Sequence, residues 1–189
     1  MSRYHHGDLR RALVDAALQL LHDGGVQKLS LRQVARAASV SHAAPYRHFA
    51  SRTELLASVA EVGFEQLGSA IKSATTSAET PQRQLLAESR QYLNFALKNP
   101  HLYRLMFGPE VNKLDFPSLA QTSMETFNLL VIRLHHVHTA EQRPEDSVHA
   151  QAIVLWSTLH GLAHLMLDGQ LGTSGLQDVD DLIQRAIQR

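Results

Sequence analysis

Apolar residues recur every three or four positions along nearly the whole chain, which is the spacing of amphipathic helices. In the first such segment Leu9, Leu13, Ala17 and Leu20 fall on one helical face, and Gly24-Gly25 ends the pattern. No stretch alternates apolar and polar residues over more than a few positions, as a half-buried strand would. The pattern therefore predicts an all-α fold.

Capping residues and prolines mark where the helices begin. Two capping boxes place a serine three residues before Gln or Glu, and two prolines follow a residue that caps helices. These four signals are Ser30–Gln33, Ser51–Glu54, Thr80-Pro81 and Asn99-Pro100. Together with the loops between them they predict about nine helices, at residues 9–24, 31–38, 42–48, 52–74, 81–98, 100–107, 117–138, 144–167 and 176–188.

Composition excludes several classes of protein. The chain has 189 residues, 44% of them hydrophobic and 19% charged, which is enough apolar material for a packed core. It has no cysteine, so disulfides and thiolate metal sites are excluded. The apolar runs are shorter than the roughly 20 residues of a membrane helix, and the N-terminus is too charged for a signal peptide. We expect a soluble, cytoplasmic protein without a membrane partner.

The distribution of charge is more informative than the formal net charge, which is zero. Residues 1–53 hold eight basic and three acidic side chains, a net charge of +5, whereas residues 54–189 hold 10 basic and 15 acidic ones, a net charge of −5. A basic head on an acidic body favours an anionic partner for the head. Chance variation in surface charge is the alternative.

Residues 31–49 have the pattern of a helix-turn-helix, a common DNA-binding arrangement. Ala35 supplies the small residue where two short helices cross, and Val40 anchors the turn between them. The second short helix, over 42–48 with Ser41 as its N-cap, has a diameter that suits the major groove. Its exposed side chains are expected to be His42, Ala43, Tyr46 and Arg47. A plain helical hairpin inside an all-α domain is the alternative.

The segment from Lys28 to Phe49, KLSLRQVARAASVSHAAPYRHF, and the SRTELL at 51–56 resemble the N-terminal domain of the tetracycline-repressor (TetR) family of bacterial regulators. The Tyr-x-His-Phe ending and the Ser-Arg-x-x-Leu-Leu after it are the specific part, and the likeness covers about residues 7–60. Pro45 departs from the family pattern, in which many members carry a helix-compatible apolar residue. Because it falls within or just after the first helical turn, its expected cost is smaller than in a helix interior.

This resemblance implies roles for individual side chains. Tyr46, His48 and Arg52 would contact DNA phosphates, and His42 and Ala43 would meet base edges. The N-caps Ser30 and Ser41 are further candidates, because their helices would bring backbone N–H groups near the phosphates. Pro45 is included because it can change how the reading helix sits in the groove. The charges of Arg32 and Arg36 either assist DNA binding or belong to a solvated helix face.

Two domains are predicted on this basis. A helix-turn-helix DNA-binding domain covers residues 1–52, and a helical ligand-binding and dimerisation domain covers 53–189, with the helix 52–74 connecting them. The helix 144–167 is apolar nearly all round, so it should be buried nearly all round. Small residues such as Ser157 and Gly161 would permit close approach of a second copy, which predicts a homodimer built from this helix and the last one.

Aromatic residues and histidines gather in the body. For any single member, ordinary core packing is the simpler interpretation, but as a set they would suit the wall of a small-molecule pocket. The run Trp156-Ser-Thr-Leu-His160-Gly161 also resembles the Trp-x-x-x-His-Gly of one TetR-like C-terminal subgroup. The candidate ligand-binding residues are Phe64, Tyr92, Phe95, Tyr103, Phe107, Phe127, Trp156, His160 and His164.

Enzymatic and metal-dependent functions find little support. The sequence lacks a glycine-rich phosphate loop, a Gly-x-Ser-x-Gly elbow and a His-Glu-x-x-His motif, so no cofactor is expected. His160 and His164 are spaced to chelate a metal but have no obvious third ligand, and the cluster His135-His136-Val-His138 is interpreted as the end of a helix.

We therefore predict a ligand-responsive dimeric regulator of transcription, a repressor with operator DNA and a small-molecule effector as partners. The alternative is a small-molecule-binding helical protein whose head is only an interaction module.

Overall fold

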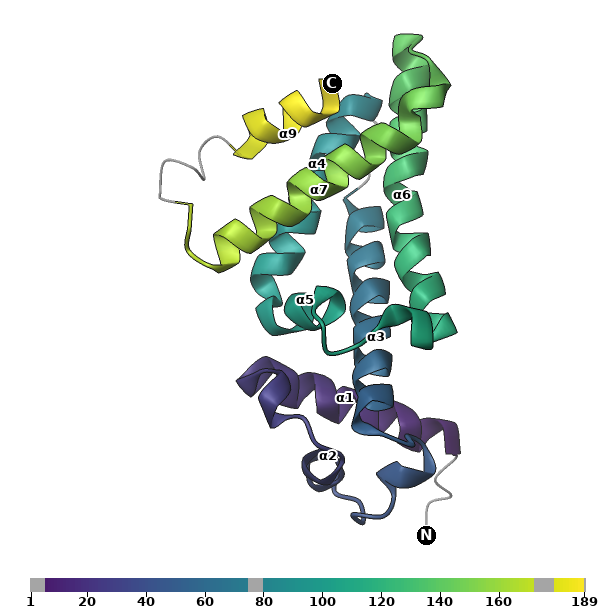
Figure 1. Cartoon of the computed structure of the whole chain (residues 1–189), viewed down its shortest axis with the longest axis vertical. Coiled ribbons are helices and arrows are strands. Elements are labelled where there is room, and N and C mark those ends of the chain that lie inside the picture. The colour runs from purple at the N-terminus through teal and green to yellow at the C-terminus, as the bar shows by residue number, and fades with distance from the viewer. Residues whose placement is uncertain (1–5, 75–79, 172–178, 189) are drawn as a thin grey trace. The chain divides into compact units, whose positions relative to one another are not determined.

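The computed structural model describes residues 6–74, 80–171 and 179–188, and these residues form helices without any strand. The all-α prediction is confirmed. Residues 75–79 of the predicted loop and 176–178 of the last predicted helix lie outside the described part. The helices, labelled in Figure 1, are α1 His6–Gly24, α2 Leu31–Ala37, α3 Arg52–Ser73, α4 Pro81–Lys98, α5 Pro100–Phe107, α6 Pro117–Glu141, α7 Val148–Leu167 and α9 Val179–Gln188.

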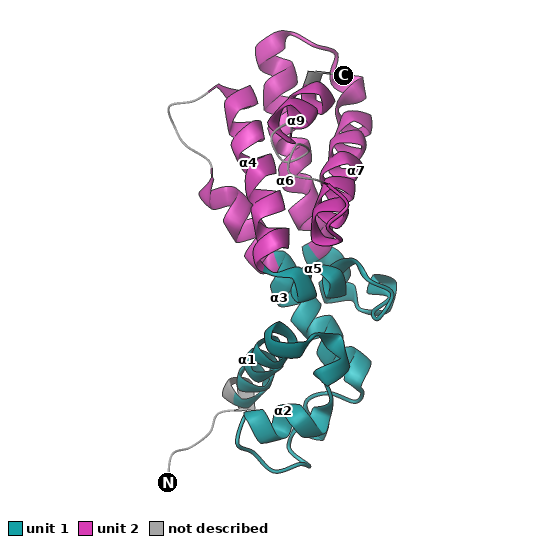
Figure 2. Cartoon of the chain, turned by 90° about the vertical axis from the view of Figure 1, so that its left-hand side faces the viewer, with its two compact units in different colours: residues 1–64, 99–122 teal, residues 65–98, 123–189 magenta. Residues whose placement is uncertain are grey.

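The chain forms two compact units (Figure 2). Unit 1 comprises residues 1–64 and 99–122, and unit 2 comprises residues 65–98 and 123–189. Helices α3 and α6 each belong to both units, and the chain also passes between them from α4 to α5. The units are thus discontinuous in sequence, and the boundary at residue 52 stays a prediction.

A small aliphatic core holds unit 1 together. Leu13 and Leu21 of α1, Val34 of α2, and Leu56 of α3 are at most 1% exposed. Phe49 is fully buried among them, and the Arg10 guanidinium lies 5.1 Å from its ring centroid. The same guanidinium donates a hydrogen bond to the Ser58 hydroxyl at 2.7 Å, so it ties α1 to α3 while it covers the aromatic ring.

Side-chain caps begin three helices where the sequence predicts them, whereas Asn99 makes no capping hydrogen bond from its side chain at the start of α5. Ser30 Oγ accepts a hydrogen bond from the Gln33 amide at 3.2 Å, and Ser51 Oγ accepts one from the Glu54 amide at 3.1 Å. Thr80 caps α4 in the same way, from the Arg83 amide at 3.4 Å. Each cap satisfies a donor that the first helical turn leaves unpaired. The predicted starts of α2, α3 and α4 are confirmed.

The predicted reading helix over 42–48 is not an α-helix. The segment is a turn followed by one 3₁₀ turn, η2, over Pro45–Arg47. In an α-helix capped at Ser41, the amide of residue 45 would donate the first hydrogen bond to the Ser41 carbonyl, and proline has no amide proton. The Ala44 amide donates to that carbonyl instead, at 3.0 Å, which is a 3₁₀ bond. The predicted helix over 42–48 was therefore wrong, and Pro45 accounts for its absence.

A Schellman motif ends α2 and sets the direction of the chain in the turn. The Val40 amide donates to the Ala35 carbonyl at 2.9 Å, which is the six-to-one bond of this motif. Ser39 between them has φ +56°, in the left-handed region that glycine usually occupies. Val40 itself is half-buried, as expected for the residue that anchors the turn.

Unit 2 is built on contacts among α4, α7 and α9. Arg90 of α4 donates two hydrogen bonds to the Asp180 carboxylate of α9, at 2.7 and 2.6 Å. These bonds lower the pKa of Asp180 below its usual value and raise the pKa of Arg90. Both side chains are about half exposed, so the pair is a surface contact that adds little free energy to the packing of α9.

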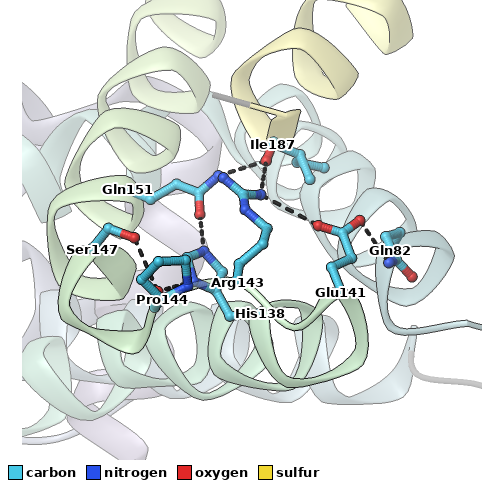
Figure 3. Close-up of polar contacts among 8 residues, drawn as sticks. All are labelled: Gln82, His138, Glu141, Arg143, Pro144, Ser147, Gln151 and Ile187. Carbon is cyan, nitrogen blue, oxygen red and sulfur yellow. Dashed lines mark hydrogen bonds and ion pairs between the residues drawn. The ribbon is translucent and has the colours of Figure 1, made fainter.

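A buried polar network holds the end of α9 against α6 and α7 (Figure 3). The Gln151 side chain donates to the Ile187 carbonyl at 2.5 Å, and its oxygen lies 2.5 Å from His138 Nε2. His138 Nδ1 faces the Pro144 carbonyl at 2.7 Å, and the ring is fully buried. His138 lies in the last turn of α6, as predicted, although α6 continues to Glu141. Its ring packs inward, where both of its nitrogens face polar partners.

Replacing Ser39 by glycine should raise the free energy of unfolding by about 1 kcal/mol, because glycine adopts positive φ without the strain of a Cβ atom. Ser39→Ala is the matched control, since alanine keeps the Cβ atom and should give no gain. Urea denaturation of the full chain, followed by circular dichroism, measures both variants. A glycine variant no more stable than the alanine variant would contradict the left-handed conformation at this residue.

Candidate nucleic-acid interface and aromatic cluster

The segment between α2 and α3 presents a row of exposed side chains. Ser41, His42 and Ala43 are exposed in the turn, and Tyr46 is 59% exposed in η2. Pro45 is buried, and Phe49 anchors the end of the segment in the core. The backbone is therefore fixed from within while polar and aromatic groups face outward, as a surface that contacts DNA requires.

The other predicted DNA-binding residues have distinct surroundings. Arg32 and Arg36 are exposed on α2, and Ser30 is the half-buried cap of that helix. His48 is half-buried beside η2. Arg52 differs from all of these because its guanidinium donates hydrogen bonds within the protein, to the carbonyls of Val26 and Leu29. Sequence reasoning missed this contact, since nothing in the local pattern relates residues more than 20 positions apart.

The candidate ligand-binding residues divide between the two units. Tyr92, Phe95, Phe127, Trp156, His160 and His164 belong to unit 2, and Phe64, Tyr103 and Phe107 belong to unit 1.

In unit 2 the rings on α7 follow one another along the helix. The Trp156 and His160 ring centroids are 5.6 Å apart, and those of His160 and His164 are 4.6 Å apart. Phe127 of α6 meets Trp156 edge-on at 5.9 Å, and the Tyr92 hydroxyl lies 3.4 Å from His160 Nδ1. This aromatic cluster, Tyr92, Phe127, Trp156, His160 and His164, combines apolar faces with a few groups that can form hydrogen bonds.

In unit 1 the three aromatic rings pack together, and two of them lie against a lysine. Phe64 and Phe107 pack edge-to-face at 5.3 Å, and Tyr103 lies 4.9 Å from Phe107. Lys113 Nζ is 4.8 Å from the ring centroids of both phenylalanines. Burial lowers the pKa of the Lys113 ammonium, because its charge is taken out of water, and the two ring faces offset part of that cost. Lys113 begins the short 3₁₀ helix η3, Lys113–Asp115, in a stretch without helical periodicity, so no sequence pattern indicated this contact.

The described residues also bear on whether the protein could bind a metal ion or span a membrane. No group of three or more His, Cys, Asp or Glu side chains that could hold a metal ion occurs among residues 6–74, 80–171 and 179–188. One helix in those ranges, Glu145–Leu167, is long and apolar enough to cross a membrane by length and composition alone, and 33% of its apolar window is buried. A core or interface helix passes the same test.

Two family models match the chain. Residues 13–59 match the model for bacterial regulatory proteins of the tetR family, and residues 85–189 match the model of the tetracycline repressor-like C-terminal domain. The first match covers the helix-turn-helix, and the second covers α7 and α9 together with most of α4. The helical fold and the two matches define a DNA-binding transcriptional regulator, which is not a class of enzyme. The chain belongs to the tetracycline-repressor (TetR) family.

Individual relatives agree with this assignment. The HTH-type transcriptional regulator BetI of Rhizobium meliloti (strain 1021) is 34% identical over 125 residues, which are 65% of this chain and 57% of that protein. The chain thus matches a little over half the length of this curated relative. A protein of unknown function from Rhodococcus sp. RHA1 has a solved structure with TM-score 0.82 and 35% identity, covering 100% of this chain and 96% of its own.

A second solved structure, a TetR-like transcriptional regulator also from Rhodococcus sp. RHA1, superimposes with TM-score 0.69 over 99% of this chain and 97% of its own. At 18% identity it shows the fold alone.

Replacing Tyr46 by alanine should weaken binding to every DNA duplex by a similar factor, about tenfold, because a phosphate contact positions the protein without reading sequence. Stability should hardly change, since the side chain is exposed. Leu114→Ala is the control, because Leu114 is 85% exposed in unit 1 but lies outside the proposed interface. Fluorescence anisotropy with specific and unrelated duplexes measures both variants. Unchanged affinity in the Tyr46 variant would contradict this placement of the interface.

Proposed function

We propose that the protein is a dimeric, cytoplasmic repressor that binds operator DNA through the exposed segment 41–47 and α2, and that a small molecule bound at the aromatic cluster releases it. The observation that carries the proposal is the exposed, internally anchored row of Ser41, His42, Ala43 and Tyr46 beside the basic face of α2. A positively charged surface of this kind is attracted to the phosphate backbone, whatever the base sequence.

The dimer is proposed from the two sides of α7. Leu155 and Leu159 are buried within the protomer, whereas Val154 and Leu165 are 47% and 43% exposed. Between these exposed residues lies Gly161, where an added Cβ atom would meet nothing within 4 Å. An apolar helix face with a central glycine suits close packing against a second helix. Two copies related by a twofold axis would cover it, and they would pair two helix-turn-helix segments for a palindromic operator.

Response to a ligand is proposed to pass along α3. This helix begins in unit 1 at Arg52 and ends in unit 2 at Ser73, so it is covalently shared by both units. A ligand that binds one arrangement of unit 2 better than another shifts the population of α3 positions. The spacing of the paired helix-turn-helix segments then no longer matches half-sites that are about one helical turn of DNA, or a multiple of it, apart.

An electrophoretic mobility shift with genomic fragments flanking the protein's own gene tests the function. A regulator should retard a specific fragment in the presence of excess unrelated DNA. The competing function, a ligand-binding helical protein whose head is only an interaction module, predicts that no fragment is preferred. Binding that is equally strong for all fragments would also argue against an operator.

Gly161→Glu should convert the dimer to a monomer without unfolding it, because the new side chain extends from an open face of the protomer and brings two like charges together at the proposed twofold contact. Ala140→Glu, at an exposed position near the end of α6, is the matched control and should remain dimeric. Sedimentation velocity at micromolar concentration distinguishes the two states. A Gly161→Glu variant that sediments as a dimer would place the interface elsewhere.

His160→Ala should retain operator binding but lose release by the effector, because His160 with Tyr92 supplies a polar partner in an otherwise apolar cluster. The effector is sought by quenching of Trp156, the chain's one tryptophan, with a library of apolar and aromatic compounds. His136→Ala, exposed on α6, is the control. If no compound both quenches Trp156 saturably and releases DNA, the cluster is ordinary core. In that case the free energy of unfolding of His160→Ala should fall by about 1–3 kcal/mol, without a specific effect of any ligand.

A further inference from the structure

Arg52, the first residue of α3, is hydrogen-bonded to the connection between α1 and α2. Its Nε donates to the Leu29 carbonyl at 2.5 Å, and one terminal nitrogen donates to the Val26 carbonyl at 2.7 Å. Val26 opens the short 3₁₀ helix η1, Val26–Lys28, and Leu29 is its C-cap. A single guanidinium therefore bridges two carbonyls at either end of the connection, more than 20 residues away in sequence.

The position of this cation is unfavourable for α3 itself. The N-terminus of a helix carries partial positive charge, so an arginine there is repelled by the helix dipole. The carbonyls of Val26 and Leu29 carry partial negative charge and offset that repulsion, and the Val26 carbonyl also accepts the Leu29 amide at 3.1 Å. The two donors, Nε and one terminal nitrogen, have a fixed spacing in the planar guanidinium, which the compact ammonium of lysine does not reproduce. These features favour a built contact over an incidental orientation of a surface side chain.

The connection that Arg52 holds leads directly into α2. Leu29 is 1% exposed, and the next residue, Ser30, is the N-cap of α2. On another side the connection is restricted by α5, because a Cβ atom at Gly25 would lie 3.2 Å from His101 Nδ1. The start of α2 is thus fixed by the start of α3 and the start of α5, all within unit 1.

We infer that Arg52 is a positioning residue for DNA binding: it fixes α2 to α3 through the carbonyls of Val26 and Leu29, and it does not act as a phosphate contact. The part of the inference that concerns DNA binding rests on the proposed function, but the clamp formed by the two hydrogen bonds can be tested without DNA.

The test compares Arg52→Met, Arg52→Lys and Arg47→Met in the full chain. Methionine removes the charge and the hydrogen bonds, and lysine keeps the charge but not the fork. Arg47 is an exposed cation in η2, and no hydrogen bond or ion pair of its side chain is found among the described residues, so Arg47→Met controls for loss of one positive charge. Hydrogen exchange at the amides of 29–34, without DNA, is the first readout.

The second readout is the salt dependence of binding to the 30-base-pair duplex that the wild-type protein recovers best from a random-sequence pool. The clamp predicts faster exchange at 29–34 in both Arg52 variants but not in Arg47→Met. It also predicts binding weakened by about tenfold or more in both Arg52 variants, with the wild-type slope of log affinity against log salt retained.

A phosphate contact predicts the opposite pattern. Arg52→Lys would then bind DNA nearly as well as the wild type. In Arg52→Met the slope of log affinity against log salt would decrease in magnitude by about 1.8, because a dimer loses two phosphate contacts. Hydrogen exchange at the amides of 29–34 would not change. Either that pattern or equal exchange in all three variants overturns the inference. If no duplex is recovered from the pool, the proposed function fails, and the exchange readout alone decides whether the clamp exists.

Discussion

Helix α7 carries more apolar surface than one protomer covers. Its residues are apolar on nearly every side, as in a helix that is buried all round. However, Ile153, Val154 and Leu165 are each more than 40% exposed. Apolar surface left in water is unfavourable by about 25 cal/mol per Å², so a second surface that covered this face would be stabilising. A lipid bilayer could also cover the apolar surface of an isolated helix. Helix α7, however, packs within its own protomer against α4 and α9. We propose that a dimer covers this face and that it would pair two DNA-binding segments.

The DNA-binding segment depends on a second constraint, which is local. Pro45 removes the hydrogen bond that would begin a reading α-helix, and the chain replaces it with a 3₁₀ turn anchored by Phe49. Exposed side chains are thereby concentrated in the turn at 41–43 and at Tyr46. Contacts with base edges would come from a short, rigid segment, and we expect a correspondingly larger share of the affinity from phosphate contacts and from α2.

The sequence was sufficient for most features that follow from local chemistry, although the helix over 42–48 was predicted wrongly despite the local effect of Pro45. Apolar periodicity predicted the helices, and the caps at Ser30, Ser51 and Thr80 were found as predicted. It was insufficient where the outcome depends on a partner distant in the chain. The contact of Arg52 with Val26 and the burial of His138 against Gln151 have no local signal. Aromatic residues could be recognised as a set, but their division between two units depends on how the helices pack, which periodicity does not encode.

Selection of duplexes from a random-sequence pool by the full-length protein is the most direct test of the central claim, that exposed α7 surfaces pair two DNA-binding segments. The account predicts enrichment of an inverted repeat whose half-site centres are about 10 base pairs, or a multiple of that spacing, apart. Enrichment should require the dimer, so a monomeric variant should select no repeat. Enrichment of a single unrepeated motif, or of no motif at all, would contradict the account.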